Sequence, residues 1–206
     1  MKVDGAETWR VFCAIDLPVS VRSLVLGYIA RLKEAMPHAR ASWARDANLH
    51  LTLKFLGEIP QTSVADFSQA VSRAVAGVQP FSLRLEHTGI FPSHGQPRVL
   101  WIGISDPSAK LAELHARLEA ESAQAGFAKE GRGFHPHLTI ARLRQPADAR
   151  ALAAAHMQME FEPVEIAVTK LLVIRSELSS EGSQYTVVSR HLLQADHETN
   201  IQPLDE

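Results

Sequence analysis

The stretch NLHLTLKFLG, residues 48–57, has the alternating pattern of a half-buried β-strand but carries a histidine within it. Side chains on a strand alternate between its two faces, so His50 and Thr52 share one face and the neighbouring leucines share the other. Burying an imidazole without a hydrogen-bond partner is unfavourable. We therefore expect the leucine face to pack in the core and the His50 face to open onto a cleft.

The same pattern, His-Leu-Thr followed by an aliphatic residue, occurs again in FHPHLTIARL, residues 134–143. His137 and Thr139 share one face of this predicted strand for the same reason. One histidine on a strand is most often a structural residue, but two copies in matching surroundings favour a functional role. A twofold arrangement of two lobes would bring both histidines and both threonines to a single cleft.

Both copies lie in the same order of predicted elements: strand, helix, strand with the motif, helix, strand. The expected strands are 9–16, 48–57, 81–91, 98–104, 135–143, 161–178 (one strand or two) and 185–193. The expected helices follow Pro18, Pro60, Asp106 and Pro146.

This order predicts an α+β fold of two similar lobes related by a pseudo-twofold axis. We expect each lobe to be a mixed or antiparallel sheet covered by helices, with the active-site cleft between them. Residues 1–193 are expected to form one bilobal domain whose lobes are intertwined in sequence. Residues 194–206 are expected to form a polar, flexible tail.

The composition limits the classes of function. The 206 residues carry a formal net charge of −2, which argues against bulk binding of nucleic acid but leaves room for a small nucleotide site. The single cysteine, Cys13, excludes an internal disulfide and favours a reducing compartment. The sequence has no apolar run typical of a signal peptide or a membrane span. We expect a cytoplasmic monomer with no membrane contact.

Two imidazoles and two hydroxyl groups in one cleft suit the cleavage of a phosphodiester. A neutral histidine can take a proton from water while a protonated one donates to the leaving oxygen. The ordinary histidine pKa of about 6.5 allows both roles near neutral pH. The threonine hydroxyls could donate to the phosphate oxygens on which charge builds in the transition state.

In these motifs and their surroundings the sequence resembles the 2H phosphoesterases, a family named for two His-x-Thr-x motifs. Within that family it is most similar to the RNA 2′,3′-cyclic phosphodiesterase (2′-5′ RNA ligase) type. The resemblance covers about residues 9–192 and is carried by RVFCAIDLP, NLHLTLKFLGE, PRVLWIGI, HPHLTIAR and LLVIRSELSSEGSQYTVV. It implies a bilobal fold with a central cleft. It also implies hydrolysis of a 2′,3′-cyclic phosphate to a 2′-phosphate without a metal or other cofactor.

The resemblance implies roles for the motif residues. His50 matches the general acid and His137 the general base, while Thr52 and Thr139 match the phosphate-binding threonines. Arg142 is a further candidate for phosphate binding through its guanidinium fork. Strict strand alternation would place Arg142 on the face opposite His137, unless the chain bends.

Three other residues have candidate roles. Phe91, beside a predicted turn, is the best candidate for stacking on a base, as in many complexes with single-stranded RNA. His135 could join His137 and His50 in a zinc site, but no acidic or cysteine ligand lies at metal spacing, so no metal site is predicted. Lys54 is expected to be a solvated charge rather than a phosphate contact.

The expected substrates are RNA ends or nucleoside cyclic phosphates, and 2′-5′ RNA ligation is a formally related reverse reaction. Two alternatives remain open at this point. One is an RNA-end-binding module without turnover, and the other is a 2H phosphodiesterase acting on another small cyclic phosphate. Binding alone needs no matched acid and base, so the paired motifs favour an enzyme.

Overall fold

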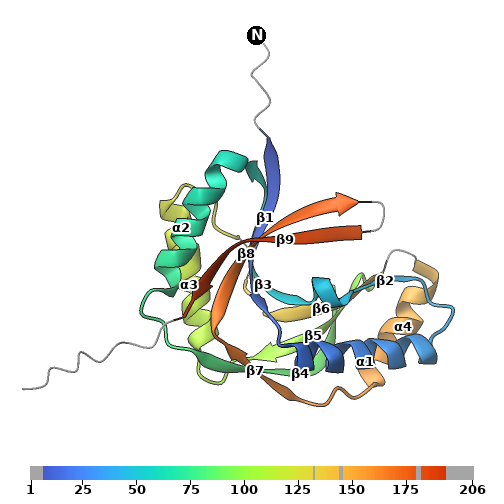
Figure 1. Cartoon of the computed structure of the whole chain (residues 1–206). Coiled ribbons are helices and arrows are strands. Elements are labelled where there is room, and N and C mark those ends of the chain that lie inside the picture. The colour runs from blue at the N-terminus through green and yellow to red at the C-terminus, as the bar shows by residue number, and fades with distance from the viewer. Residues whose placement is uncertain (1–6, 132, 144–145, 180–181, 194–206) are drawn as a thin grey trace, which may run out of the picture.

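The computed structural model describes residues 7–131, 133–143, 146–179 and 182–193, and no side chain is described for 146 or 147. In these residues the chain forms two antiparallel sheets and four α-helices (Figure 1). The tail expected over 194–206 lies outside the described residues. The α+β fold class predicted from the sequence is confirmed.

The first sheet has four strands in the order β3-β1-β8-β9. They are β1 (Thr8–Asp16), β3 (His50–Pro60), β8 (Lys170–Ser179) and β9 (Gly182–Leu192). The second sheet has five strands in the order β2-β6-β5-β4-β7. They are β2 (Ala41–Trp43), β4 (Phe81–Phe91), β5 (Val99–Ser105), β6 (His137–Leu143) and β7 (Val164–Val168). Both motif strands, β3 and β6, therefore lie at or next to a sheet edge.

The four helices pack in two pairs, one for each sheet. They are α1 (Val19–Ala35), α2 (Val64–Val75), α3 (Lys110–Gln124) and α4 (Pro146–Gln158), and short 3-10 helices cover Asp46–Asn48 and Gln61–Ser63. Helices α2 and α3 pack together, α2 against β8 and β9 and α3 against β3. Helix α1 packs on α4, which contacts β4 of the second sheet.

Two of these helices cross between the lobes. Helix α1 follows β1 of the first sheet but packs with α4 beside the second, and α3 follows β5 of the second sheet but packs with α2 over the first. A continuous hydrophobic cluster includes residues of both sheets, such as Val11, Leu51, Leu100 and Leu138. This crossing and the shared core favour a single domain.

The structure changes some predicted boundaries. The segment predicted as one strand or two over 161–178 is two, and β7 and β8 belong to different sheets. Strand β2, only three residues long, was not predicted because so short a stretch has no readable pattern. Strand β3 does not end at Gly57 but passes through it, with φ +72°, to Pro60.

A β-bulge follows the threonine of each motif. Thr52 pairs with Ala14 and Lys54 with Cys13, which leaves Leu53 as the extra residue. In β6, Thr139 pairs with Trp101 and Ala141 with Leu100, which leaves Ile140 as the extra residue. An extra residue resets the alternation of faces. The residue five positions after each histidine therefore faces the same side as the histidine.

Candidate active site

A cleft of about 880 Å³ lies where the two motif strands meet. Its walls come from β1, β3, β6, the segment around β2, and the hairpin of β8 and β9. The structure brings together five predicted site residues in this cleft, His50, Thr52, His137, Thr139 and Arg142.

The charge of the cleft is positive. Arg10, Arg45 and Arg142 line it, and none of the described lining residues is acidic. The protein as a whole has a formal net charge of −2, so the positive charge is local. Such a cleft favours an anionic ligand such as a phosphate ester.

His137 has the tautomer that a general base needs. Its Nδ1 lies 2.7 Å from the carbonyl oxygen of His135. Because a carbonyl oxygen only accepts, Nδ1 carries the proton and Nε2 keeps a lone pair. Burial lowers the pKa of His137 below its ordinary value of 6.5, the bond to His135 opposes this, and the charge of Arg142 adds to it. The imidazole is therefore neutral at pH 7.

His50 sits against aromatic side chains. Its ring stacks on Phe12 at a centroid distance of 4.8 Å and meets Tyr185 edge-on at 5.3 Å. Burial lowers its pKa to about 4, while a hydrogen bond to the Asn48 backbone and the charge of Asp16 oppose this shift. A general acid must be protonated when it acts. A phosphate bound beside His50 would supply negative charge that raises its pKa.

The other polar groups of the motifs are available to a ligand. Within the described residues, neither the Thr52 nor the Thr139 hydroxyl has a protein hydrogen-bond partner, and Arg142 makes no ion pair. The charge of Arg142 contributes to the lowered pKa of both His50 and His137. Its guanidinium therefore lies close enough to act on both imidazoles.

The bulge at Ile140 explains why Arg142 reaches the cleft. Regular alternation would have turned Arg142 away from His137, but the extra residue returns it to the same face. Ile140 and Ala141 are both buried, while Arg142 is exposed and lines the cleft.

Phe55 is the residue that the sequence analysis missed. It occupies in β3 the position that Arg142 occupies in β6, lines the cleft, and keeps 46% of its surface exposed. The Arg10 guanidinium lies over its ring, 4.6 Å from the centroid. Phe55 follows His50 by five positions, as Arg142 follows His137. If a bulge had been assumed in both motifs, Phe55 would have been predicted to face the cleft.

Phe91 has a different position from Phe55. It is not among the residues that line the cleft, and its ring meets His137 edge-on at 5.0 Å and packs on Trp101 at 5.1 Å. Contact between Phe91 and a base stays a prediction. What Phe91 does contact is the imidazole of the candidate base.

The hairpin of β8 and β9 is tied to the segment before the first motif. Arg45 Nη2 and Asn48 Nδ2 both donate to the carbonyl oxygen of Ser183, each at 3.1 Å. These bonds join one wall of the cleft to the residues that lead into His50.

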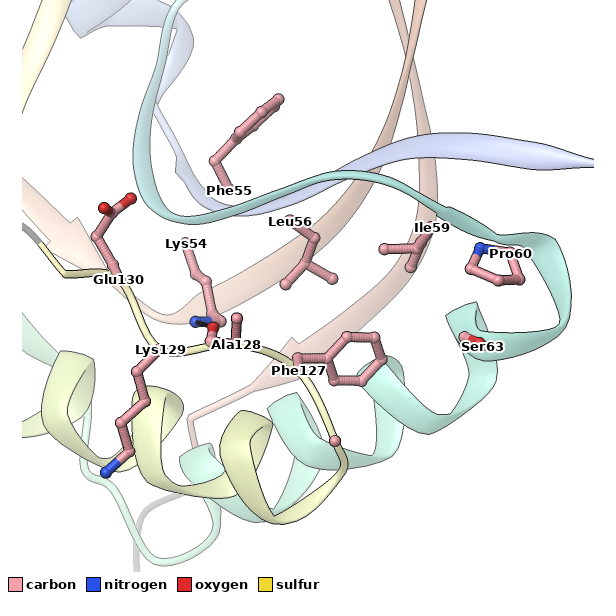
Figure 2. Close-up of a pocket in the computed structure, with 11 residues that line it drawn as sticks. Lys54, Phe55, Leu56, Ile59, Pro60, Ser63, Phe127, Ala128, Lys129 and Glu130 are labelled. Carbon is pink, nitrogen blue, oxygen red and sulfur yellow. Dashed lines mark hydrogen bonds between the residues drawn. The ribbon is translucent and has the colours of Figure 1, made fainter.

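The expectation that Lys54 is a solvated charge is wrong. Its side chain is 2% exposed, not solvated, and pairs with Glu119 on the far side of β3. A second cavity of about 420 Å³ lies on that side (Figure 2). Among the described residues, Phe55 alone lines both this cavity and the cleft.

Two features are absent from the described residues. No group of three or more histidine, cysteine or acidic side chains there is placed to hold a metal ion. In the same part of the chain, no helix has the length and apolar character needed to cross a membrane.

Comparison with known proteins identifies the family. The family model for the 2′-5′ RNA ligase superfamily matches residues 21–179. The RNA 2′,3′-cyclic phosphodiesterase of Methanothermobacter thermautotrophicus is 30% identical over 86% of this chain and 95% of that protein. The enzyme of the same name from Escherichia coli is 32% identical over 91% of this chain and 98% of that protein.

A solved structure shares the fold. The crystal structure of E. coli LigT complexed with 3′-AMP is similar at a TM-score of 0.73 and 28% identity, covering 92% of this chain and 100% of that one. The family match extends over most of the sequence and includes both histidine motifs. This chain belongs to the 2′-5′ RNA ligase superfamily, the 2H phosphoesterases.

Proposed function

We propose that this protein is an RNA 2′,3′-cyclic phosphodiesterase that hydrolyses cyclic phosphate ends to 2′-phosphates. The observation that carries the proposal is the convergence of two histidines, two threonines and Arg142 on one cleft. The names of the relatives from M. thermautotrophicus and E. coli support it. The 3′-AMP in the similar LigT structure supports a nucleotide ligand.

The reaction we propose needs one base and one acid. His137 Nε2 takes a proton from water as the water oxygen bonds to phosphorus, and the bond from phosphorus to the 3′-oxygen breaks. His50, protonated in the complex with the anionic substrate, gives its proton to that 3′-oxygen. The two histidines exchange protons with solvent before the next turnover.

The remaining groups stabilise the charge on the phosphate. Thr52 and Thr139 donate hydrogen bonds to the two non-bridging oxygens, and Arg142 offers a guanidinium fork. All these groups come from one chain. We infer that a monomer is sufficient for activity.

We infer a base-binding role for Phe55. It is the exposed aromatic residue of the cleft, and one face of its ring is covered by Arg10. The other face offers a surface on which a nucleobase can stack. A base-binding surface favours RNA ends over cyclic phosphates that lack a base.

Product analysis tests the proposal directly. The protein is treated with a chelator, dialysed, and given nucleoside 2′,3′-cyclic phosphates, a short RNA with a cyclic phosphate end, and a 3′,5′-cyclic nucleotide. We expect a 2′-phosphate from the first two substrates and no turnover of the third. Binding without turnover would instead identify an RNA-end-binding module. A 3′-phosphate product would show that the other ester bond breaks.

A further inference from the structure

Lys54 points away from the cleft into the protein. Because Leu53 is the extra residue of the bulge, Lys54 faces the core and Phe55 faces the cleft. Figure 2 shows the two side chains pointing to opposite sides of the strand. Only 2% of the Lys54 side chain is exposed. A buried charge is unfavourable unless partners replace its hydration, so those partners indicate its role.

The partners of Lys54 join three parts of the chain. Its Nζ donates to Glu119 Oε1 of α3 at 2.7 Å. It also donates to the carbonyl oxygen of Ala128 at 2.9 Å, and Figure 2 shows Lys54 and Ala128 close together. The other carboxylate oxygen of Glu119 accepts the backbone N–H of Glu130 at 3.1 Å. One buried ion pair therefore holds the backbone at residues 128 and 130.

A second contact holds the same segment nearer to the active site. The His115 ring of α3 stacks on Phe134 with a centroid distance of 3.8 Å and an angle of 7°. His115 Nε2 also lies 4.0 Å from Glu119 Oε1. The described residues between Gln124 and His137 belong to no helix or strand. Their positions therefore depend on side-chain contacts such as these rather than on the hydrogen bonds of a regular element.

This segment supports the candidate base. His135 provides the carbonyl oxygen that accepts the proton of His137 Nδ1, and Pro136 alone separates the two histidines. If the segment shifted, Nδ1 would lose its acceptor and the proton could move to Nε2. An Nε2 that carries the proton cannot accept one from water.

We propose that the buried Lys54–Glu119 pair positions His137 by holding the backbone at residues 128 and 130, on the approach to His135, so that the strand carrying one catalytic histidine also orients the other. The pair does not touch the substrate. For its effect on turnover this proposal rests on the proposed function, but the tautomer of His137 is independent of it.

The test removes both charges together, so that no unpaired charge stays buried. The variant is Lys54→Met with Glu119→Leu, because a glutamine at position 119 would keep an oxygen that accepts the Glu130 N–H. We expect kcat on a nucleoside 2′,3′-cyclic phosphate to fall about tenfold, since small displacements of a catalytic group are costly, while KM stays within about twofold. Nitrogen NMR of the ¹⁵N-histidine-labelled protein should show His137 shifting from the Nδ1–H form toward a mixture. His50 should keep its tautomer.

A matched control removes another ion pair of α3. Arg73 Nε and Glu121 Oε2 lie 2.6 Å apart between α2 and α3, and the variant Arg73→Met with Glu121→Leu should behave as the parent protein. A folded Lys54/Glu119 variant with unchanged kcat and unchanged His137 tautomer would overturn the proposal.

A second variant covers the case in which the first does not fold. Glu119→Asp keeps the charge of the pair but shortens the carboxylate by one methylene, so that it no longer spans Lys54 and the Glu130 N–H. We expect the same change of tautomer to a smaller extent, and an unchanged His137 tautomer in Glu119→Asp would then overturn the proposal. Absence of turnover by the parent protein would contradict the proposed function, while the NMR comparison would still decide this inference.

Discussion

The two motif strands repeat one backbone pattern and place different side chains in it. In β3 and in β6, the histidine and threonine are followed by a bulge that brings the fifth residue after the histidine back to the cleft. That residue is Phe55 in β3 and Arg142 in β6. One strand therefore adds an aromatic surface to the cleft, and the other adds a positive charge.

The two imidazoles also differ in their surroundings. His50 packs against Phe12 and Tyr185, and its pKa is lowered to about 4. His137 has its Nδ1 proton held by the His135 carbonyl, which leaves Nε2 free to accept. The repeated motif therefore sets where the imidazoles lie, whereas their neighbours set the pKa of His50 and the tautomer of His137.

The largest expected effect comes from removing either histidine. We expect His50→Ala and His137→Ala each to lower kcat on a cyclic phosphate by about 10²–10⁴-fold, the usual contribution of a general acid or base. His94→Ala, which removes an exposed histidine that does not line the cleft, should have no effect. Steady-state kinetics at several pH values measures all three. A loss of less than tenfold in one variant would show that only one imidazole transfers a proton.

The threonines should matter less than the histidines. We expect Thr52→Ala and Thr139→Ala each to lower kcat by on the order of 10²-fold, because each removes one hydrogen bond to the charge of the transition state. Thr→Ser should retain most activity because it keeps the hydroxyl. Wild-type turnover by both alanine variants would show that these hydroxyls do not touch the phosphate.

The residues that differ between the strands should affect different kinetic constants. We expect Arg142→Met to lower kcat by about tenfold, because a charged hydrogen bond to the phosphate is lost. Phe55→Ala should raise KM for a nucleotide by about tenfold through lost stacking, with little change in kcat. For a cyclic phosphate without a base, Phe55→Ala should have no effect. A fall in kcat with unchanged KM in Phe55→Ala would contradict the stacking role.

A further expected effect is on stability. His50 has a folded-state pKa of about 4, below its ordinary value of 6.5. The folded state therefore binds fewer protons than the unfolded state between these values. The free energy of unfolding should fall as pH decreases from about 6.5 toward 4, and the contribution of His50 is complete above about 6.5.

Urea unfolding from pH 7.5 to pH 4.5 measures this dependence. His50→Gln should flatten the slope because it removes one of the titrating groups, whereas His94→Gln should leave the slope unchanged. Burial also lowers the pKa of His156 and His191, so part of the slope should persist in His50→Gln. An unchanged slope in His50→Gln would show that the folded state does not disfavour the charged form of this imidazole.

Much of the fold follows from patterns that the sequence displays directly. Alternation around His50 and His137 predicts strands with one apolar face, and burial of the intervening leucines, Leu51 and Leu138, agrees with it. The duplicated order of elements predicts two similar sheets. The crossing of α1 and α3 between the lobes was not predictable, because an amphipathic helix does not encode which sheet it covers.

The bulges mark the limit of what the sequence predicts at the site. Residues 52–55, Thr-Leu-Lys-Phe, fit regular alternation, which would place Lys54 in the cleft beside His50 and Thr52. The extra residue buries Lys54 and brings Phe55 to the cleft instead. A bulge depends on pairing with a neighbouring strand, so a single strand does not reveal it.

The most direct test of the assigned roles uses a substrate whose leaving group needs no proton. A nitrophenyl phosphodiester releases a stable anion, so loss of the general acid should matter little while loss of the general base still slows the attack of water. We predict that His50→Ala recovers most of the parent rate on this substrate and that His137→Ala stays slow. Recovery by His137→Ala alone would reverse the assignment. Recovery by neither would contradict acid–base catalysis by these two histidines.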